Sequence, residues 1–551
     1  MSGMQGATEP RHPVQSEERA EPPPASGETT ARTRLLVALW ALCILLPLVV
    51  RLGAAPLFDV DEGAFAEATR EMVASGDYGF PTLDGAPRFD KPILVYWLQA
   101  ASVRAFGLSE WALRLPSALS VWLWCLAVAA FAGRRWGRRT GLLAGTVLAT
   151  SVGPLIIGRA CTADGLLNLL LALALLDGWR FLESRRRAPL LRAYLWIGLG
   201  LLTKGPIALL VPAAVSTVHL LCHRRPREWV RVAFDPVGWL VLLLVAGPWY
   251  AYALHLHGAG FVNGFLLKHN IARFTSTMEH HGGSVMYYVP ILPVLLLPWS
   301  ALLASAVRSL WRGSRGSLDA YLLVWCGFVL AFFSLSGTKL PHYALYGSTP
   351  LVLGIAIAAN DASARVRTWV AGTTTVLLLL LVMGPWFLPA VSTIIRDPLY
   401  AALLREPGSA WPLQLGAAGG LLASSLAWRR WGPTVPVLSV CAAALSLVVS
   451  ALGTPWLGET LQSPVKHAAL VARALRQDTV QWDVRIPSFS LYRGEATPRG
   501  DPAPGQLAIT NVSMLAGRDS STRVLFQERG YALVLLDYPR SGWTQQTAEA
   551  P

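Results

Sequence analysis

Long apolar runs recur along most of this sequence. A membrane-spanning helix needs about 20 largely apolar residues, and thirteen runs approach or reach that length. They lie near residues 35–52, 112–132, 141–158, 165–182, 191–203, 206–222, 237–256, 286–307, 318–335, 343–358, 368–388, 411–428 and 434–452. Charged residues make up only 15% of the chain, against roughly 25% in soluble proteins. The sequence therefore predicts an all-α polytopic membrane protein with about thirteen transmembrane helices.

Arginine clusters alternate with these runs and predict the orientation. They occur at Arg32 and Arg34, 134–139, 185–187, 224–231, 308–315, Arg365 and Arg367, and Arg429 and Arg430. Basic residues concentrate on the cytoplasmic side of membrane proteins, so we expect a cytoplasmic N-terminus and an extracytoplasmic C-terminus. The net charge of +14 then reflects topology and gives no reason to expect nucleic acid as a partner.

Three regions follow from this pattern. Residues 1–33 are polar, and we expect them to form a disordered cytoplasmic tail. Residues 34–455 are expected to form the transmembrane domain, and residues 456–551 a small extracytoplasmic α/β domain. That last region contains a helical pattern at 466–476 and strand-like runs at 506–510 and 532–536.

The outer loop 53–111 contains two helical patterns. The segment 93–106 is short and interrupted by polar residues, so we expect an interfacial helix. An amphipathic helix is expected at 63–74, with Phe65 and Met72 on its apolar face and Glu67 on its polar face.

The same outer loop carries charged residues beside the membrane. Asp61 and Glu62 follow the first span, and Asp90 and Lys91 precede the interfacial segment. Carboxylates at a membrane boundary are costly unless they are solvated, paired or functional. Asp61 could also cap the following helix, and Asp90 with Lys91 could form a solvated pair of little consequence.

Further charged and polar residues lie in the other predicted outer loops. They are Arg159, Asp164, Lys204, Lys268, His269, Arg273, His280, His281, Lys339, His342 and Tyr343. Asp164 could be a helix cap, and Lys204 could extend to the outer surface. All five lysines of the chain fall on this side. Together the cations suit a phosphate or diphosphate headgroup, and a carboxylate could act as general base, which suggests group transfer from a lipid-linked phosphate.

The motifs resemble a known family. The segment DVDEGAFAEATREMVASGDYGFPTLDGAPRFDKPILVYW, with Arg159–Asp164, TKG, KHNIARF and GTKLPHY, is similar to the bacterial 4-amino-4-deoxy-L-arabinose (lipid A) transferases. These belong to the protein O-mannosyltransferase-like clan of GT-C glycosyltransferases. The resemblance implies a GT-C fold with a polyprenyl-phosphate-sugar donor, no nucleotide cofactor, and an acceptor that is lipid A, a glycan or a protein.

The resemblance also implies roles for individual residues. Asp61 and Asp164 match the acids regarded as catalytic, while Glu62, Arg159 and His342 belong to the same motifs. Donor phosphate binding is implied for a second set: Lys91, Lys204, Arg273, Lys339 and Tyr343. Asp90 and His269 resemble positions linked to zinc, although the family usually has Glu where this chain has Asp90.

The sequence thus predicts a glycosyltransferase of the bacterial inner membrane acting at its outer face. The alternative is a non-catalytic transporter or flippase for a lipid or a lipid-linked sugar, because a basic outer cavity would also receive a phospholipid headgroup.

Overall fold

The computed structural model describes residues 27–277, 282–313, 318–515 and 522–536. It consists of two units, Met1–Leu42 and Cys43–Pro551. Most of the predicted N-terminal tail lies outside the described residues, and helix α1 (Gly27–Val49) begins within the remainder.

Every one of the thirteen predicted apolar runs falls on a helix or a bent helix pair. Among the described residues, eight helical segments are long and apolar enough to cross a membrane: Ala31–Val49, Glu110–Trp136, Asp164–Ser184, Pro226–Thr275, Leu318–Leu335, Pro341–Asp361, Ala364–Ser392 and Val435–Leu461. The number rises to ten if each of two bent pairs is one span. These pairs are Arg138–Thr150 with Val152–Gly158, bent by 66°, and Val285–Leu295 with Trp299–Arg312, bent by 112°. The polytopic all-α class is therefore confirmed.

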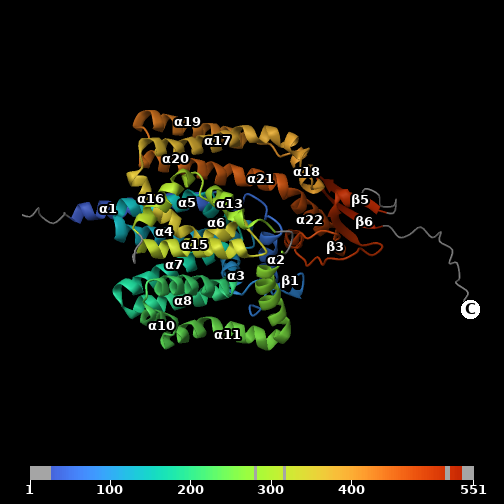
Figure 1. Cartoon of the computed structure of the whole chain (residues 1–551). Coiled ribbons are helices and arrows are strands. Elements are labelled where there is room, and N and C mark those ends of the chain that lie inside the picture. The colour runs from blue at the N-terminus through green and yellow to red at the C-terminus, as the bar shows by residue number, and fades with distance from the viewer. Residues whose placement is uncertain (1–26, 278–281, 314–317, 516–521, 537–551) are drawn as a thin grey trace, which may run out of the picture. The chain divides into compact units, whose positions relative to one another are not determined.

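The helices of this bundle have the following bounds (Figure 1). They are α4 (Glu110–Trp136), α5 (Arg138–Thr150), α6 (Val152–Gly158), α7 (Asp164–Ser184), α8 (Arg187–Lys204), α9 (Ile207–Cys222), α10 (Pro226–Ala233), α11 (Pro236–Phe261), α13 (Tyr288–Leu295), α14 (Leu303–Arg312), α15 (Leu318–Leu335), α16 (Ser348–Asp361), α17 (Ala364–Ser392), α18 (Pro398–Arg405), α19 (Trp411–Trp431), α20 (Val435–Val448) and α21 (Thr454–Leu461). The predicted runs 191–203, 206–222 and 411–428 correspond to α8, α9 and α19.

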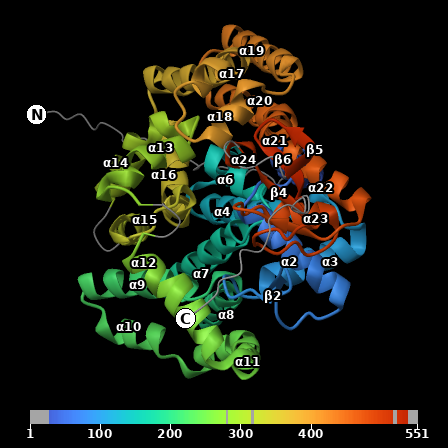
Figure 2. The ribbon, with the colours of Figure 1, turned by 90° about the vertical axis from the view of Figure 1, so that its right-hand side faces the viewer.

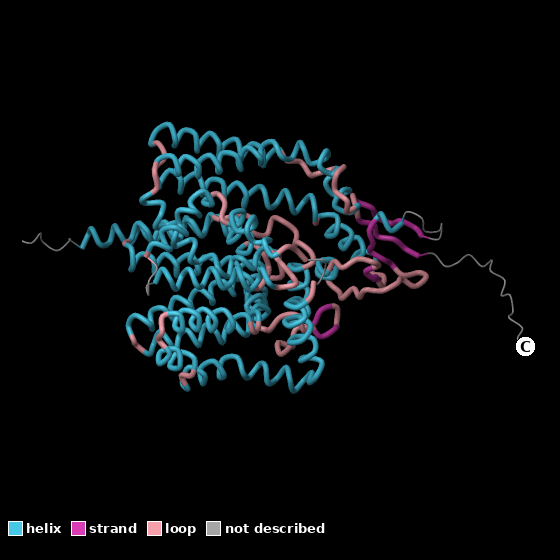
Figure 3. The backbone as a smooth tube through the Cα atoms, viewed as in Figure 1, coloured by secondary structure: helices cyan, strands magenta, loops and turns pink. Residues whose placement is uncertain are grey.

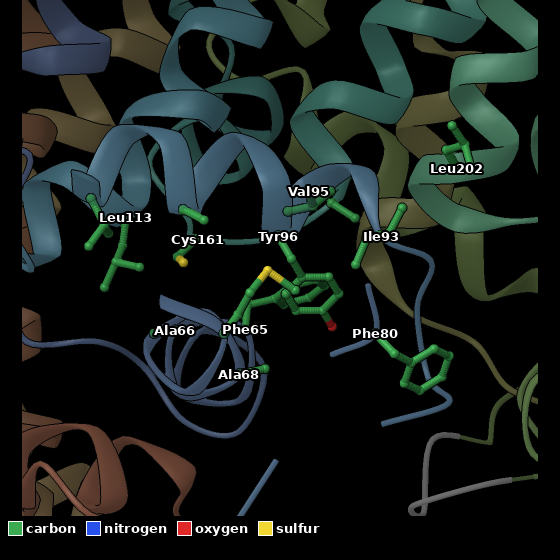
Figure 4. Close-up of a cluster of buried hydrophobic side chains, with 14 of the residues drawn as sticks. Phe65, Ala66, Ala68, Phe80, Ile93, Val95, Tyr96, Leu113, Cys161 and Leu202 are labelled. Carbon is green, nitrogen blue, oxygen red and sulfur yellow. The ribbon is translucent and has the colours of Figure 1, made fainter. Parts of the chain in front are cut away.

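The first outer loop folds into two helices and a small hairpin. Helix α2 (Asp61–Ser75) is followed by β1 (Thr82–Leu83), β2 (Ala86–Pro87) and α3 (Leu94–Phe106). Phe65 of α2 stacks on Tyr96 of α3 with ring centroids 5.4 Å apart, within the apolar cluster of Figure 4. Glu67 differs from the expectation, because it is fully buried. Its carboxylate instead accepts hydrogen bonds from the Arg70 guanidinium at 2.6 and 2.7 Å.

The C-terminal region forms the expected α/β domain. Its helices are α22 (Ser463–Leu475), α23 (Pro487–Arg493) and α24 (Val512–Leu515), and its strands are β3 (Thr479–Gln481), β4 (Leu507–Asn511), β5 (Thr522–Glu528) and β6 (Tyr531–Leu536). The strand order is β3-β4-β6-β5, with β3 parallel to β4 and the other pairs antiparallel. Figure 3 shows these strands gathered beyond one end of the helices. The predicted helix and both predicted strands are present.

The C-terminal domain lies against the first outer loop. Helix α23 packs on α2, and the two are neighbours in Figure 2. Lys466 of α22 forms an ion pair of 2.6 Å with Glu110 at the start of α4. The two regions that the sequence separates by about 400 residues are thus in direct contact.

Candidate functional site

The predicted outer residues converge on two adjoining cavities of about 490 Å³ each. One is lined mainly by apolar side chains from α9, the segment 266–275 and α15, and we call it the apolar cavity. The other, the polar cavity, is lined by charged residues of the first outer loop, α7 and the C-terminal domain. The two cavities share Asp90, Lys91, Lys204, His269, Arg273 and Tyr343. An apolar space therefore leads directly into a cluster of cations.

Asp61 is the first residue of α2 and lines the polar cavity. Its side chain is exposed and makes no hydrogen bond or ion pair with any described residue, nor does it cap α2. The helix N-terminus stabilises a carboxylate there through its unpaired N–H groups and dipole. Asp61 is thus an ionic group directed at a cavity, available to a ligand.

Asp164 is the first residue of α7, lines the polar cavity and is bound by neighbours through one carboxylate oxygen. One carboxylate oxygen, Oδ1, accepts hydrogen bonds from Lys204 Nζ at 2.6 Å and from Tyr346 Oη at 2.7 Å, with His342 Nε2 at 3.6 Å. Lys204 Nζ also donates to Tyr346 Oη at 2.8 Å. A buried charge needs such partners. In this arrangement Asp164 holds the Lys204 ammonium in place beside both cavities.

The turn after Lys204 depends on glycine. Gly205 ends α8 with a φ of 79°, a conformation that favours residues without a Cβ. A Cβ at this position would lie 2.5 Å from the Phe265 ring. The TKG motif therefore places the lysine at the last helical position and allows the segment 262–272 to approach closely.

Lys91 and Asp90 lie where the two cavities meet. Burial, reinforced by the neighbouring Lys204 ammonium, lowers the pKa of Lys91 to about 8. Burial would raise the pKa of Asp90, but its hydrogen bond with His269 and the charges of Arg88 and Lys91 hold that pKa well below its usual range. A bound phosphate would offset the mutual repulsion of Lys91 and Lys204, so the site is arranged to receive an anion.

Tyr343 and Arg273 complete the boundary between the cavities. Both line each cavity. The Lys204 ammonium lies over the Tyr343 ring, 5.5 Å from its centroid. Tyr343 belongs to a 3-10 helix, Pro341–Gly347, which also carries His342 and Tyr346.

Three predicted residues do not line either cavity. The Glu62 carboxylate accepts hydrogen bonds from the Arg114 guanidinium at 2.7 and 2.9 Å and from Cys161 N at 2.6 Å. Arg159 donates to backbone carbonyls near the end of α1, including Val50 O at 2.9 Å. Lys339 Nζ donates to Ser336 O at 2.6 Å. These side chains make structural contacts around the site, and Glu62 and Arg159 line a separate, mostly apolar cavity of about 390 Å³.

The lining of the site also includes residues that the sequence did not lead us to expect, among them Tyr346, Arg88, Tyr400 and Arg485. Tyr346 binds both Asp164 and Lys204, while Arg88, Tyr400 and Arg485 line the polar cavity. Arg88 is 6% exposed and its Nη2 lies 3.6 Å from Asp90 Oδ2. Arg88 lies within the recognised first-loop segment, three residues before Lys91, and Tyr346 lies three residues after the GTKLPHY motif ends at Tyr343. No local signal distinguishes Tyr400 or Arg485.

Asp90 and His269 do not form a metal centre with other described residues. His269 Nε2 lies 2.7 Å from Asp90 Oδ1, so each is bound to the other. Zinc sites in proteins have three or four protein ligands, and these two belong to no group of three candidate ligands in the described chain. His280 and His281 lie outside the described residues. The three carboxylates that do cluster, Glu67, Glu71 and Asp84, all accept hydrogen bonds from protein donors.

Comparison with known proteins identifies relatives. A family model described as dolichyl-phosphate-mannose-protein mannosyltransferase matches residues 90–252. The undecaprenyl phosphate-alpha-4-amino-4-deoxy-L-arabinose arabinosyl transferase of Aeromonas salmonicida is 32% identical over 440 residues, 76% of either chain. That of Erwinia tasmaniensis is 32% identical over 386 residues, 67% of this chain and 68% of its own.

The fold also has a close structural match. The crystal structure of ArnT from Cupriavidus metallidurans bound to undecaprenyl phosphate has a TM-score of 0.75, with 22% identity, and covers 92% of this chain and 98% of its own. The arrangement of the helices and the C-terminal domain is therefore shared with that protein.

Proposed function

The chain belongs to the family of bacterial undecaprenyl phosphate-4-amino-4-deoxy-L-arabinose arabinosyl transferases, and we propose that it transfers this aminosugar from undecaprenyl phosphate to a phosphate group of lipid A. The family resemblance carried by the sequence motifs is confirmed. The chain is a multi-pass glycosyltransferase of the bacterial inner membrane that uses a polyprenyl-phosphate-linked sugar.

The junction of the two cavities is the observation that carries this proposal. A polyprenyl-phosphate sugar has an apolar chain, an anionic phosphate and a polar sugar in that order. The apolar cavity, the cations Lys91, Lys204 and Arg273, and the polar cavity follow in the same order. We infer that the lipid chain lies in the apolar cavity, that the phosphate binds the cations, and that the sugar faces Asp61.

In this arrangement the cations assist the leaving group. An oxygen of the acceptor phosphate bonds to the anomeric carbon while the bond from that carbon to the donor phosphate oxygen breaks, and negative charge grows on the departing undecaprenyl phosphate. Lys91, Lys204 and Arg273 stabilise that charge. An acceptor phosphate oxygen is already ionised near neutral pH, so it needs no general base, and Asp61 then stabilises the positive charge that develops on the sugar. Asp164 acts by holding Lys204.

The acceptor side of the polar cavity is formed by other elements. Tyr400 of α18 and Arg485, which follows β3, line it together with Asp59 and Asp61. An arginine matches a phosphate geometrically and electrostatically. We propose that the acceptor phosphate enters between the first outer loop and the C-terminal domain.

The site lies at one end of the helices, opposite the arginine clusters. Asp164 begins α7 while Arg185 caps its end, and Arg187 begins α8 while Lys204 ends it. The 18 residues of α8 separate those ends by about 27 Å, close to the hydrocarbon thickness of a bilayer. With the positive-inside rule, we propose a cytoplasmic N-terminus and an extracytoplasmic site and C-terminal domain.

Purified protein in proteoliposomes tests the proposed function. With undecaprenyl-phosphate-linked 4-amino-4-deoxy-L-arabinose as donor and lipid A as acceptor, we expect aminosugar-modified lipid A in a mass spectrum, together with free undecaprenyl phosphate. A glucose-linked polyprenyl phosphate serves as the control donor. Movement of the intact donor between leaflets without any transfer would contradict the proposal and favour the transporter alternative.

Substitution of Lys204 by alanine is expected to raise the donor KM about 10- to 100-fold, because a hydrogen bond to a charged group contributes about 1.5–3 kcal/mol. A lysine that merely extends to the membrane surface would leave the donor KM unchanged. Transfer kinetics at varied donor concentration distinguish the two roles.

Two further variants control for side effects of this change. Lys204→Ala leaves the buried Asp164 carboxylate without its ammonium partner, so the double variant Lys204→Ala with Asp164→Asn should show the same rise in KM without an unpaired charge. Lys268 is exposed and lines neither cavity, and Lys268→Ala should leave the donor KM unchanged. An equal rise in donor KM in the Lys268 variant would mean that the effect of Lys204→Ala comes from the loss of general surface charge.

A further inference from the structure

Helix α23 of the C-terminal domain is bonded to the first outer loop at three places. Ser490 Oγ donates to Asp84 Oδ1 at 2.7 Å. Tyr492 Oη accepts from Leu57 N at 2.8 Å. Ser488 donates to Asp59 from both its backbone and its side chain. The bond to Asp84 anchors the loop 23 residues after Asp61, whereas the bonds to Leu57 and Asp59 lie four and two residues before it.

Ser488 and Asp59 are joined by two hydrogen bonds. Ser488 N donates to Asp59 Oδ1 at 3.0 Å, and Ser488 Oγ donates to Asp59 Oδ2. Gly63, in the first turn of α2, makes room for this arrangement. A Cβ on Gly63 would lie 2.1 Å from Asp59 Oδ1 and 2.5 Å from Ser488 N. The carboxylate is therefore held between the beginning of α2 and the beginning of α23.

Burying the Asp59 carboxylate costs free energy, and the hydrogen bonds from Ser488 offset part of that cost. Burial raises the pKa of Asp59 to about 7, and both hydrogen bonds from Ser488 oppose that rise. When desolvation destabilises the charged form of a carboxylate, hydrogen-bond donors from the protein are needed to stabilise it. Without the Ser488 hydroxyl, Asp59 would keep only the hydrogen bond from the Ser488 backbone. The turn that contains Asp59 would then be less firmly fixed.

The Asp61 carboxylate makes no hydrogen bond or ion pair with another described residue, and the charged neighbours Arg88 and His342 act on it only electrostatically. The backbone of residues 59–62 therefore sets where this side chain starts. Glu62 is fixed on one side of Asp61 by Arg114. Asp59 is fixed on the other side by Ser488.

We propose that Ser488 is a positioning residue for sugar transfer, which holds the Asp59 carboxylate and through it the turn that directs Asp61 into the polar cavity. The proposal rests on the proposed function. It gives the C-terminal domain a specific part in the reaction, since a residue more than 400 positions from Asp61 in the sequence completes the support of that side chain.

The test compares Ser488→Ala with Ser490→Ala in the transfer assay. Both variants remove one serine hydroxyl from the same helix, and both hydroxyls bind a carboxylate of the first outer loop. We expect Ser488→Ala to lower kcat about 10- to 100-fold, because small displacements of a reacting group cost up to about 10² in rate. Its donor KM should stay within about twofold of the wild-type value. Ser490→Ala should retain wild-type kcat, with a thermal stability similar to that of Ser488→Ala.

A double variant adds a second readout. If Ser488 acts through Asp59, then Asp59→Asn combined with Ser488→Ala should lower kcat no further than the more damaging single change. Equal losses of kcat in the Ser488 and Ser490 variants would show a general effect of domain docking and overturn the proposal. So would wild-type kcat in Ser488→Ala, or losses that multiply in the double variant. Failure of the proposed function differs from all of these, because the wild-type protein would then transfer no aminosugar.

Discussion

Asp61→Asn is expected to reduce sugar transfer by about three orders of magnitude while the protein still binds its donor. Asparagine has nearly the same shape as aspartate, so the start of α2 should keep its structure. The substitution removes only the negative charge that faces the polar cavity. Groups that stabilise charge developing in a transition state contribute about 10²–10³ each, and general bases contribute about 10²–10⁴. Either role for Asp61 predicts a loss of this size.

The measurement is aminosugar transfer by the purified variant in proteoliposomes, alongside binding of a radiolabelled donor. Asp77→Asn is the matched control, because Asp77 is an exposed carboxylate of the same outer loop that accepts a bond from Gly79 N and lines neither cavity. That variant should transfer at the wild-type rate. Normal turnover by Asp61→Asn would remove Asp61 from the reaction, and loss of donor binding would reassign it to donor recognition.

Arg114→Ala is expected to destabilise the protein by about 3–5 kcal/mol, because it leaves the buried Glu62 carboxylate without its partner. Arg114 and Glu62 are both almost fully buried. The guanidinium also donates to three backbone carbonyls that follow the first span, those of Leu52, Ala55 and Pro56. One side chain thus connects α4, the end of the first span and the first turn of α2.

Thermal unfolding of the detergent-solubilised variant checks this expectation. Arg135→Ala is the control, because its ion pair with Glu183 has a similar length of 2.9 Å but both side chains are nearly half exposed. Exposed pairs contribute about 0–1 kcal/mol, so that variant should melt close to the wild-type protein. Similar losses in both variants would mean that burial does not set the strength of the Arg114 contact.

The apolar runs were a reliable guide to the helices because their signal is local. A stretch of about 20 apolar residues is costly in water wherever it occurs, and all thirteen runs fall on helices or bent pairs. The bends were not part of the prediction, although the sequence carries a local signal for them. Pro154 lies just after the break between α5 and α6, and Pro298 lies in the break between Leu295 and Trp299, and proline interrupts helices.

For the site residues too, the sequence predicted some positions correctly and could not predict others. Asp61, Lys91, Lys204, Arg273 and Tyr343 do meet at one pair of cavities, as their motifs and the order of the loops led us to expect. The destination of a charged side chain, however, depends on its partners in space. Glu62 is bound by Arg114, Arg159 is directed to backbone carbonyls, and Lys339 is bound to Ser336 O. Of the three, only Lys339 was expected to bind the donor phosphate, while Glu62 and Arg159 were expected to belong to the functional motifs.

The amino-acid sequence was enough to identify a polytopic membrane protein, the family it resembles and the loops that carry its charged residues. These features depend on hydrophobicity and short motifs, which act over a few to about 20 residues. The contacts of Tyr346 and Asp164 with Lys204, and the support that Ser488 gives to the turn before Asp61, became visible in the folded chain alone. Such contacts join residues 40 to more than 400 positions apart. They exist only after helix packing and domain docking bring those segments together.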